Sequence, residues 1–181
     1  MSKAINKDIM SWDKFPDYDI IWCDPPWEQK MVKYFETMMY KSGQQKPNNN
    51  IEQIIKKLAD LSSKEKPIFI ECSIKGSELI ASIMQSSGHV LNNITNSTQE
   101  NNMPYCILSF NTTNCLDGSN KGFSIIDYAC QNIDFNVVFD PFAGVGKTAK
   151  SFIKNGKTYI GSEINVVRFN KLSKVIWHAQ Q

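Results

Sequence analysis

The sequence predicts one α/β domain, spanning residues 1–181, built on a doubly wound, mostly parallel sheet. Apolar runs of strand length alternate along the chain with segments of helical periodicity, which is the pattern of such sheets. The chain of 181 residues has room for one sizeable core but is short for two. The polar segments between the apolar runs do not separate the chain into two groups large enough to form independent cores, so we expect a single domain.

Five runs rich in Val, Ile, Phe and Tyr are predicted to be buried strands. They comprise residues 18–23, 67–72, 104–111, 135–140 and 157–163. Helices are predicted between them where apolar residues recur every three or four positions, at residues 51–61, 76–85, 123–132, 146–154 and 165–177. Three polar segments, 41–50, 92–102 and 111–122, are predicted to be mobile loops.

Composition restricts the class of protein. The mean hydropathy of −0.35, the absence of a long apolar run and an N-terminus without an apolar core predict a cytoplasmic protein that neither spans nor enters a membrane. The net charge of +2 permits an anionic partner without requiring one. Five cysteines without a C-x-x-C pair and two distant histidines predict reduced core thiols and no metal site.

The stretch DPFAGVGKTAK, residues 140–150, lies between a predicted strand and a predicted helix. Its end resembles the phosphate-binding loop G-x-x-x-x-G-K-[ST], but Pro141 stands where the first glycine of that motif belongs. Gly144 and Gly146 allow a sharp turn and a close approach to a ligand. The next predicted strand ends in Glu163, and a carboxylate there can accept both hydrogen bonds of a ribose diol. These features favour a nucleoside-bearing cofactor over a triphosphate, although an ordinary strand–helix turn with a surface glutamate also fits them.

A second motif, DPPW, directly follows the first apolar run. Asp24 ends this run, Pro25 and Pro26 fix the direction of the nearby carbonyls, and Trp27 adds an aromatic face. The amino group of a nucleobase is a poor nucleophile, because its lone pair is delocalised into the ring. The Asp24 carboxylate and the Pro25 carbonyl can each accept one of its N–H hydrogens, while Trp27 stacks on the base. A proline-rich turn with a capping aspartate is the alternative interpretation.

With DPPW preceding FAGVG, the chain resembles the β-group amino-methyltransferases, whose catalytic motif precedes the cofactor motif in a permuted order. The resemblance covers nearly the whole chain and implies a seven-stranded, Rossmann-like sheet that binds S-adenosylmethionine. It implies that Asp24, Pro25, Pro26 and Trp27 are catalytic. It places Asp8 at the cofactor's adenine, Glu163 at its ribose, and Lys121 and Ser124 near its methionine end. The remaining cofactor-binding positions that it implies are Asp140, Phe142, Ala143, Gly144, Gly146 and Asn165.

The chain departs from this family in three ways. Gly122 stands where proline is usual, and Lys147 where a small hydroxyl residue is common. No segment is long enough to form a separate target-recognition domain. Specificity would then come from the loops, from a partner in a homo- or heterodimer, or from a simpler substrate.

The predicted function is methylation of adenine N6 in DNA, which would place Lys30, Lys33, Lys41 or Lys46 near phosphates. RNA adenine or cytosine N4 methylation stays open. A non-catalytic nucleic-acid-binding subunit that retains the fold is a second alternative, and a nucleotide-hydrolysing protein is a third.

Overall fold

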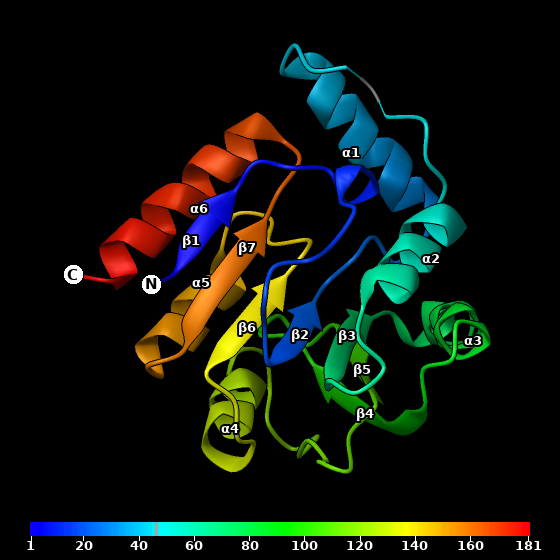
Figure 1. Cartoon of the computed structure of the whole chain (residues 1–181), viewed down its shortest axis with the longest axis vertical. Helices are drawn as coiled ribbons and strands as arrows, with labels where there is room; N and C mark the ends of the chain where they lie inside the picture. Colours follow the sequence, from blue (N-terminus) through cyan, green and yellow to red (C-terminus); the bar gives the residue numbers. More distant parts are fainter. Residues whose placement is uncertain (46) are drawn as a thin grey trace.

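The computed structural model describes residues 1–45 and 47–181, and its centre is a seven-stranded sheet in the order β1-β7-β6-β2-β3-β5-β4 (Figure 1). Strand β5 runs antiparallel to both of its neighbours, and every other neighbouring pair is parallel. This confirms the prediction of a mostly parallel, seven-stranded sheet. The strands are β1 (Lys3–Ile5), β2 (Ile20–Cys23), β3 (Ile68–Cys72), β4 (Leu91–Thr98), β5 (Pro104–Phe110), β6 (Val137–Asp140) and β7 (Thr158–Ser162).

Helices cover both faces of the sheet, as a doubly wound fold requires. On one face Ile21 and Cys23 of β2 pack with α1, α2 and α3, whereas Ile20 and Trp22 pack on the other face with α4, α5 and α6. The alternation of β2 between the two cores follows from the two-residue repeat of a strand. The helices are α1 (Gln29–Lys41), α2 (Ile51–Leu61), α3 (Ser77–Ser86), α4 (Ser124–Asn132), α5 (Lys147–Lys154) and α6 (Val166–Ala179), with short 3₁₀ turns at Ile9–Ser11 and Ile74–Gly76.

The five strands and five helices expected from the sequence are all present, within two residues at most ends. Two strands and one helix were not expected. β1 is only three residues long, and α1 occupies a segment for which no helix was predicted.

The prediction of a loop at residues 92–102 is wrong, because β4 covers Leu91–Thr98. This strand lies at the edge of the sheet, pairs only with β5, and buries Thr95 and Ser97 while exposing Asn92, Ile94 and Asn96. Its residues are polar because most of them face water, and backbone pairing rather than apolar burial determines its structure. The segment 111–122 forms no helix or strand, as predicted.

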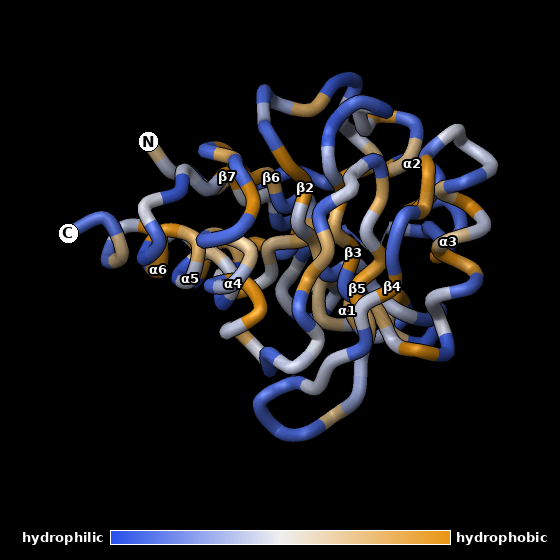
Figure 2. The backbone as a smooth tube through the Cα atoms, turned by 90° about the horizontal axis from the view of Figure 1, so that it is seen from below, coloured by the Kyte–Doolittle hydropathy of each residue, from blue (hydrophilic) through white to orange (hydrophobic). Residues whose placement is uncertain are grey.

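The apolar stretches run through the middle of the molecule, and the hydrophilic backbone lies on its outside (Figure 2). Trp22, Phe69 and Phe139 are fully buried in the central strands. Burial of each such side chain contributes about 1.5–3 kcal/mol, so the central strands anchor the fold and hold the loops at their ends in place. No helix in the described part of the chain is long and apolar enough to cross a membrane.

Candidate active site

Three acidic residues lie at the carboxyl ends of neighbouring strands. Asp140 is the last residue of β6, Asp24 directly follows β2, and Glu163 directly follows β7. Because β7, β6 and β2 are adjacent and parallel, these residues meet at one edge of the sheet although they are far apart in sequence. Ligands of open α/β sheets bind at this edge.

The Asp140 side chain holds the glycine turn together. Its Oδ1 accepts a hydrogen bond from Phe142 N at 2.9 Å, and its Oδ2 accepts from Tyr159 Oη at 2.7 Å and from Thr148 Oγ1 at 3.2 Å. Burial raises the pKa of Asp140 to about 7, and the bond from Tyr159 opposes that shift. Both carboxylate oxygens are thus engaged by the chain itself, so Asp140 shapes the turn.

Gly144 and Gly146 have positive φ angles of 58° and 85°. A Cβ at Gly144 would lie 2.6 Å from Arg168 Nη2, and a Cβ at Gly146 would lie 2.9 Å from Leu172 Cδ1. Glycine is therefore needed at both positions for the backbone conformation and for close packing against α6. Ala143, which precedes Gly144 and is buried, donates from its backbone N to Ser162 O at 2.9 Å, which ties the turn to β7.

Glu163 and Asn165 form the start of α6. Glu163 Oε1 accepts a hydrogen bond from Asn165 N at 2.8 Å, and Asn165 Oδ1 caps the helix by accepting from Arg168 N at 3.0 Å. Burial raises the pKa of Glu163. Its Oε2 lies 3.8 Å from Arg168 Nε, which is buried and has no hydrogen-bond partner within the described residues. The Arg168 guanidinium also lies over the Phe35 ring, 4.8 Å from its centroid.

A hollow opens beside Glu163, and we call it the first hollow. Its empty volume is about 810 Å³, a figure that includes the part open to solvent. Asp8 Oδ1 accepts from Met10 N at 3.0 Å and so caps the 3₁₀ turn at one wall. The lining residues on which the argument rests are Asp8, Asp24, Phe35, Phe142, Glu163 and Arg168.

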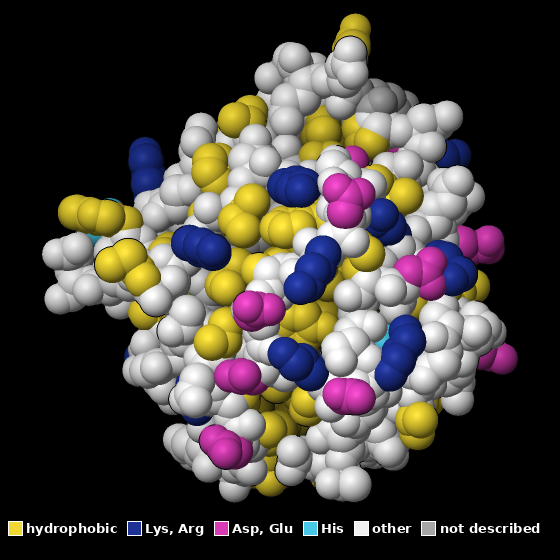
Figure 3. Space-filling view, in the orientation of Figure 1, with side chains coloured by type: hydrophobic (Ala, Val, Ile, Leu, Met, Phe, Trp, Pro, Cys, Tyr) yellow, Lys and Arg dark blue, Asp and Glu magenta, His cyan; other side chains and the backbone are white. Residues whose placement is uncertain are grey.

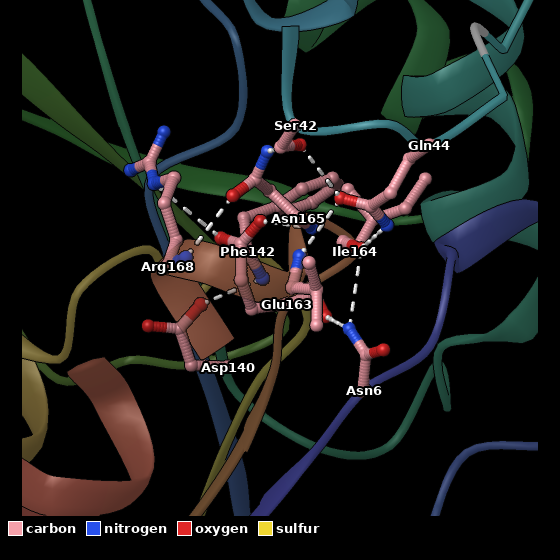
Figure 4. A network of polar contacts seen from close by, with 10 residues as sticks. Asn6, Ser42, Gln44, Asp140, Phe142, Glu163, Ile164, Asn165 and Arg168 are labelled. Carbon is pink, nitrogen blue, oxygen red and sulfur yellow. Dashed lines mark hydrogen bonds and ion pairs between the residues drawn. The ribbon is translucent and has the colours of Figure 1, made fainter. Parts of the chain in front are cut away.

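The segment that follows α1 is fastened to the turn between β7 and α6. Gln44 Nε2 donates to Ile164 O at 2.9 Å, and Gln44 Oε1 accepts from Val166 N at 2.9 Å (Figure 4). Asn6 Nδ2 donates to Glu163 O at 2.7 Å from the opposite side of this turn. Pro47 and Asn49, which follow Gln44, line the first hollow. The hydrogen bonds of Gln44 therefore hold one wall of this hollow in place.

The two ends of the DPPW motif are joined by a hydrogen bond. Trp27 Nε1 donates to Asp24 Oδ1 at 2.6 Å, so the indole fixes the carboxylate. Asp24 is exposed as a residue, but the surrounding protein atoms keep water from its carboxyl group. This loss of hydration raises the pKa of the carboxyl group to about 6. The bond from Trp27 and the charge of Arg168 both oppose this shift. Pro25 is buried, whereas Pro26 lines the first hollow.

A second hollow lies on the other side of Asp24. Glu71, on β3, projects into it, and burial together with the Asp24 charge raises the Glu71 pKa to about 8. Trp22 Nε1 donates to Glu71 Oε1 at 2.7 Å. At neutral pH Glu71 is therefore mostly protonated and can donate a hydrogen bond. The lining residues that matter here are Asp24, Glu71, Tyr105, Phe123, Lys147 and Thr148.

Known proteins resemble the chain in structure but not detectably in sequence. No family model matches it, and no curated protein matches it. Among solved structures, M1.HpyAVI in complex with S-adenosylmethionine has a TM-score of 0.68 at 15% identity, with 97% of this chain and 99% of that chain covered. TTHA0409 of Thermus thermophilus, assigned as a DNA modification methylase and complexed with S-adenosyl-L-methionine, has a TM-score of 0.65 at 12% identity, with 99% and 94% covered. The cytosine-N4-specific PvuII DNA methyltransferase has a TM-score of 0.56 at 8% identity, with 99% and 92% covered.

The chain has the fold of DNA methyltransferases. At these identities the likeness shows the fold, and the chemistry must be argued from the side chains of this chain. Within this methyltransferase fold, Asp24 is the residue that both hollows share.

Lys121 and Ser124 form a turn before α4. Lys121 N donates to Ser124 Oγ at 2.8 Å, Ser124 Oγ donates to Lys121 O at 2.6 Å, and both residues are exposed. Gly122, which lines the second hollow, has a φ of 49° and donates from its N–H to Thr98 O at 2.9 Å. Proline has neither this φ nor an N–H, so the structure explains why glycine and not proline stands at position 122.

Thr148 and Lys147, at the start of α5, lie in different surroundings. Thr148 Oγ1 donates to the buried Asp140, so it is engaged within the turn. In the described part of the chain no group of three metal-binding side chains occurs. Lys147 is exposed and lines the second hollow.

Sequence reasoning missed Glu71, Arg168 and Gln44. Glu71 is the one charged residue in an otherwise apolar strand, and Arg168 is the only arginine of the chain. Both could have been noticed as isolated charges, whereas nothing distinguishes Gln44 from its neighbour Gln45 in the sequence. Of the lysines expected near phosphates, Lys30, Lys33 and Lys41 lie exposed on α1, and Lys46 lies outside the described residues.

Proposed function

We propose that this chain is an S-adenosylmethionine-dependent methyltransferase that modifies the exocyclic amine of a nucleobase, N6 of adenine in DNA. The observation that carries the proposal is the position of Asp24, a hydrogen-bond-accepting carboxylate where two hollows meet at the carboxyl edge of the sheet. One hollow then holds the methyl donor and the other admits the base. The order of the motifs, with Asp24 before Phe142, matches the permuted β group.

The first hollow fits the cofactor chemically. Arg168 Nε is a buried donor without a hydrogen-bond partner in the described part of the chain, and its ion pair with Glu163 Oε2 is 3.8 Å long. A buried polar atom without a hydrogen bond destabilises the folded state. A ligand with hydroxyl groups could accept the hydrogen bond that Arg168 Nε lacks in the chain itself. Glu163 would accept from the ribose diol, Asp8 from the adenine amino group, and Phe142 would lie against the adenine ring.

S-adenosylmethionine supplies a methyl group already activated on a sulfonium. The chain has to orient the amine and accept the hydrogen bonds that its N–H groups donate. Asp24 accepts one N–H of the amine, and the Pro25 carbonyl accepts the other. This draws the nitrogen toward tetrahedral geometry and aims its lone pair. Trp27 holds Asp24 in one orientation by the 2.6 Å hydrogen bond.

Adenine is favoured over cytosine because an aspartate at the head of the motif is the pattern of the adenine enzymes, and serine is frequent in cytosine enzymes. Cytosine N4 is the runner-up, because the cytosine-N4-specific PvuII enzyme shares the fold. RNA as the substrate is a further alternative.

The test is incubation with labelled methyl donor and, separately, DNA, RNA and free nucleosides, followed by nucleoside analysis. We expect label in N6-methyladenine from DNA. The Asp24→Ala variant should lose about 10²-fold or more of the transfer rate while it still binds S-adenosylhomocysteine. Asp17→Ala, at an exposed position away from the site, is the matched control.

Calorimetric titration with the methyl donor and with ATP–magnesium separates the alternatives. Binding of ATP–magnesium alone would refute the proposal. Binding of the donor without transfer to any nucleic acid would indicate a non-catalytic partner subunit.

A further inference from the structure

The excess of basic over acidic residues in this chain lies at its C-terminal end. Residues 141–181 contain seven Lys and Arg side chains and a single acid, Glu163, which is buried. Residues 1–140 contain 13 basic and 17 acidic residues. The small net charge of +2 therefore combines a negative larger part with a strongly positive smaller part.

The fold turns this segregation into a surface. α5 and α6 pack against each other, and neither helix contains an acidic residue. Within each helix the exposed lysines follow the three- or four-residue spacing of one helix side, and we call the exposed lysines of both helices together the basic face. The basic face consists of Lys147, Lys150 and Lys154 on α5 and Lys171 and Lys174 on α6. In the view of Figure 3, acidic side chains lie over the centre, the right and the lower left of the molecule, and none lies over α6 at the upper left.

The charges of the basic face are not neutralised within the described residues. The ion pairs among the described residues join Lys30 with Glu28, Lys56 with Asp60, and Arg168 with Glu163, and none of them involves a lysine of the basic face. Asp127, the acid of the adjoining helix α4, accepts a 2.6 Å hydrogen bond from Asn155 Nδ2. A cluster of like charges without counter-charges repels itself, so a polyanion bound there would be stabilised by several contacts at once.

The basic face begins at the candidate active site. Lys147 is the first residue of α5 and lines the second hollow together with Asp24. From Lys147 to Lys154 the helix rises about 10 Å, which is long enough to follow more than one phosphate of a backbone. Trp177, which is 60% exposed and lies one helical turn beyond Lys174, adds an aromatic surface on which an unpaired base can stack.

We propose that the basic face of α5 and α6 binds the phosphate backbone of the nucleic acid that flanks the target base. The identity of the polyanion rests on the proposed function, whereas the surface itself rests on the charges and their exposure. Phosphate contacts position a nucleic acid without reading its sequence. The basic face would thus dock the substrate and leave the choice of the target base to other parts of the site.

The experiment measures binding of fluorescently labelled DNA duplex, single-stranded DNA and RNA by anisotropy, between about 50 and 200 mM salt. Two double variants each remove two lysines of the basic face, Lys150→Gln with Lys154→Gln and Lys171→Gln with Lys174→Gln. The control, Lys14→Gln with Lys56→Gln, changes the net charge equally at exposed positions elsewhere. Thermal unfolding checks that all variants are folded.

The plot of log K against log salt has a negative slope, and each lost phosphate contact reduces the magnitude of that slope by about 0.9 on a duplex. We therefore expect each double variant to reduce the magnitude of the slope by about 2 and to weaken binding on the order of tenfold. The control should stay close to the wild type. The three nucleic acids distinguish which backbone is bound. Double variants that behave like the control would overturn the inference.

The two proposals fail in different ways. If the wild type binds nucleic acid through these lysines but neither binds the methyl donor nor transfers methyl groups, the proposed function is wrong and this inference stands. If the wild type methylates DNA and the double variants bind and turn over DNA like the control, this inference is wrong and the proposed function stands.

Discussion

Trp27 Nε1 and Asp24 Oδ1 lie 2.6 Å apart, so the indole at the end of the DPPW motif holds the carboxylate at its beginning. The tryptophan was expected to stack on the base. Its N–H has a second use, because a hydrogen bond to the ionised carboxylate opposes the rise in the Asp24 pKa. Proline at both intervening positions restricts the backbone and brings the two side chains together.

The Trp27→Phe substitution tests this relationship, since it keeps a ring and removes the N–H. We expect the Asp24 pKa to rise above about 6 and the acid limb of the pH–rate profile to move to higher pH. The rate at neutral pH should fall on the order of tenfold, because a hydrogen bond to a charged group is lost. Affinity for S-adenosylhomocysteine serves as the control and should not change. An unmoved acid limb would contradict this use of Trp27.

Stability should depend on pH through Asp24, Glu71 and Asp140. Their folded-state pKa values of about 6, 8 and 7 lie above the usual value near 4. The folded state therefore binds more protons than the unfolded state between about pH 4 and 8, and the free energy of unfolding falls as pH rises through that window.

The Glu71→Gln variant removes one of these titrations, so its stability should fall less between about pH 5 and 8, as measured by urea unfolding at each pH. Glu78→Gln, on the exposed side of α3, is the control and should keep the wild-type dependence. An equal loss of stability in both variants would show that Glu71 does not take up a proton on folding.

Gly146 and Gly43 provide a matched pair of positive φ angles, 85° and 77°. Replacing either by alanine costs about 1–2 kcal/mol for the left-handed conformation. A Cβ at Gly43 meets nothing within 4 Å, whereas one at Gly146 meets Leu172 Cδ1 at 2.9 Å and its Cα at 3.4 Å. Gly146→Ala should therefore lose about 1–3 kcal/mol more than Gly43→Ala. Thermal or urea unfolding gives both values, and equal losses would mean that α6 moves aside freely.

Gln44 and Gln45 form a second matched pair. Gln44 bonds to Ile164 O and Val166 N, while Gln45 is exposed. We expect Gln44→Leu to weaken binding of the methyl donor on the order of tenfold, because two hydrogen bonds that hold the wall of the first hollow are lost. The maximal transfer rate should change little, because this wall shapes cofactor binding and Asp24 orients the amine. Titration calorimetry is the measurement, and Gln45→Leu should match the wild type. An unchanged affinity in Gln44→Leu would show that the segment does not shape the hollow.

Short-range patterns in the sequence were sufficient to predict most of the strands and helices. The five buried strands and five of the helices could be predicted, because a buried strand shows an unbroken apolar run and a helix on a sheet shows an apolar stripe. β4 was not predicted to be a strand, because an edge strand that faces water carries Asn and Thr where a central strand carries Ile and Val. β1 escaped because three residues are too few to show a period.

The placement of the motifs could also be predicted in part. The sequence placed Asp24 and Glu163 at the ends of predicted strands, and the structure shows that both lie with Asp140 at one edge of the sheet, because the strands they follow are parallel. What each side chain does there could not be predicted. Asp140 is engaged by Tyr159 and Thr148, and the packing against Gly144 comes from Arg168 on α6.

The sequence by itself determined the order of the five buried strands and five of the helices, the two motifs and the excess of basic over acidic residues after residue 140, because each of these is a property of neighbouring residues. Only the tertiary structure decided that Glu71 lies beside Asp24, that Gln44 fastens one wall of the first hollow, and that the two lysine-bearing helices α5 and α6 pack against each other. These are contacts between segments far apart in the chain. They depend on which strands are neighbours in the sheet and how the helices pack on it, and no local period encodes that.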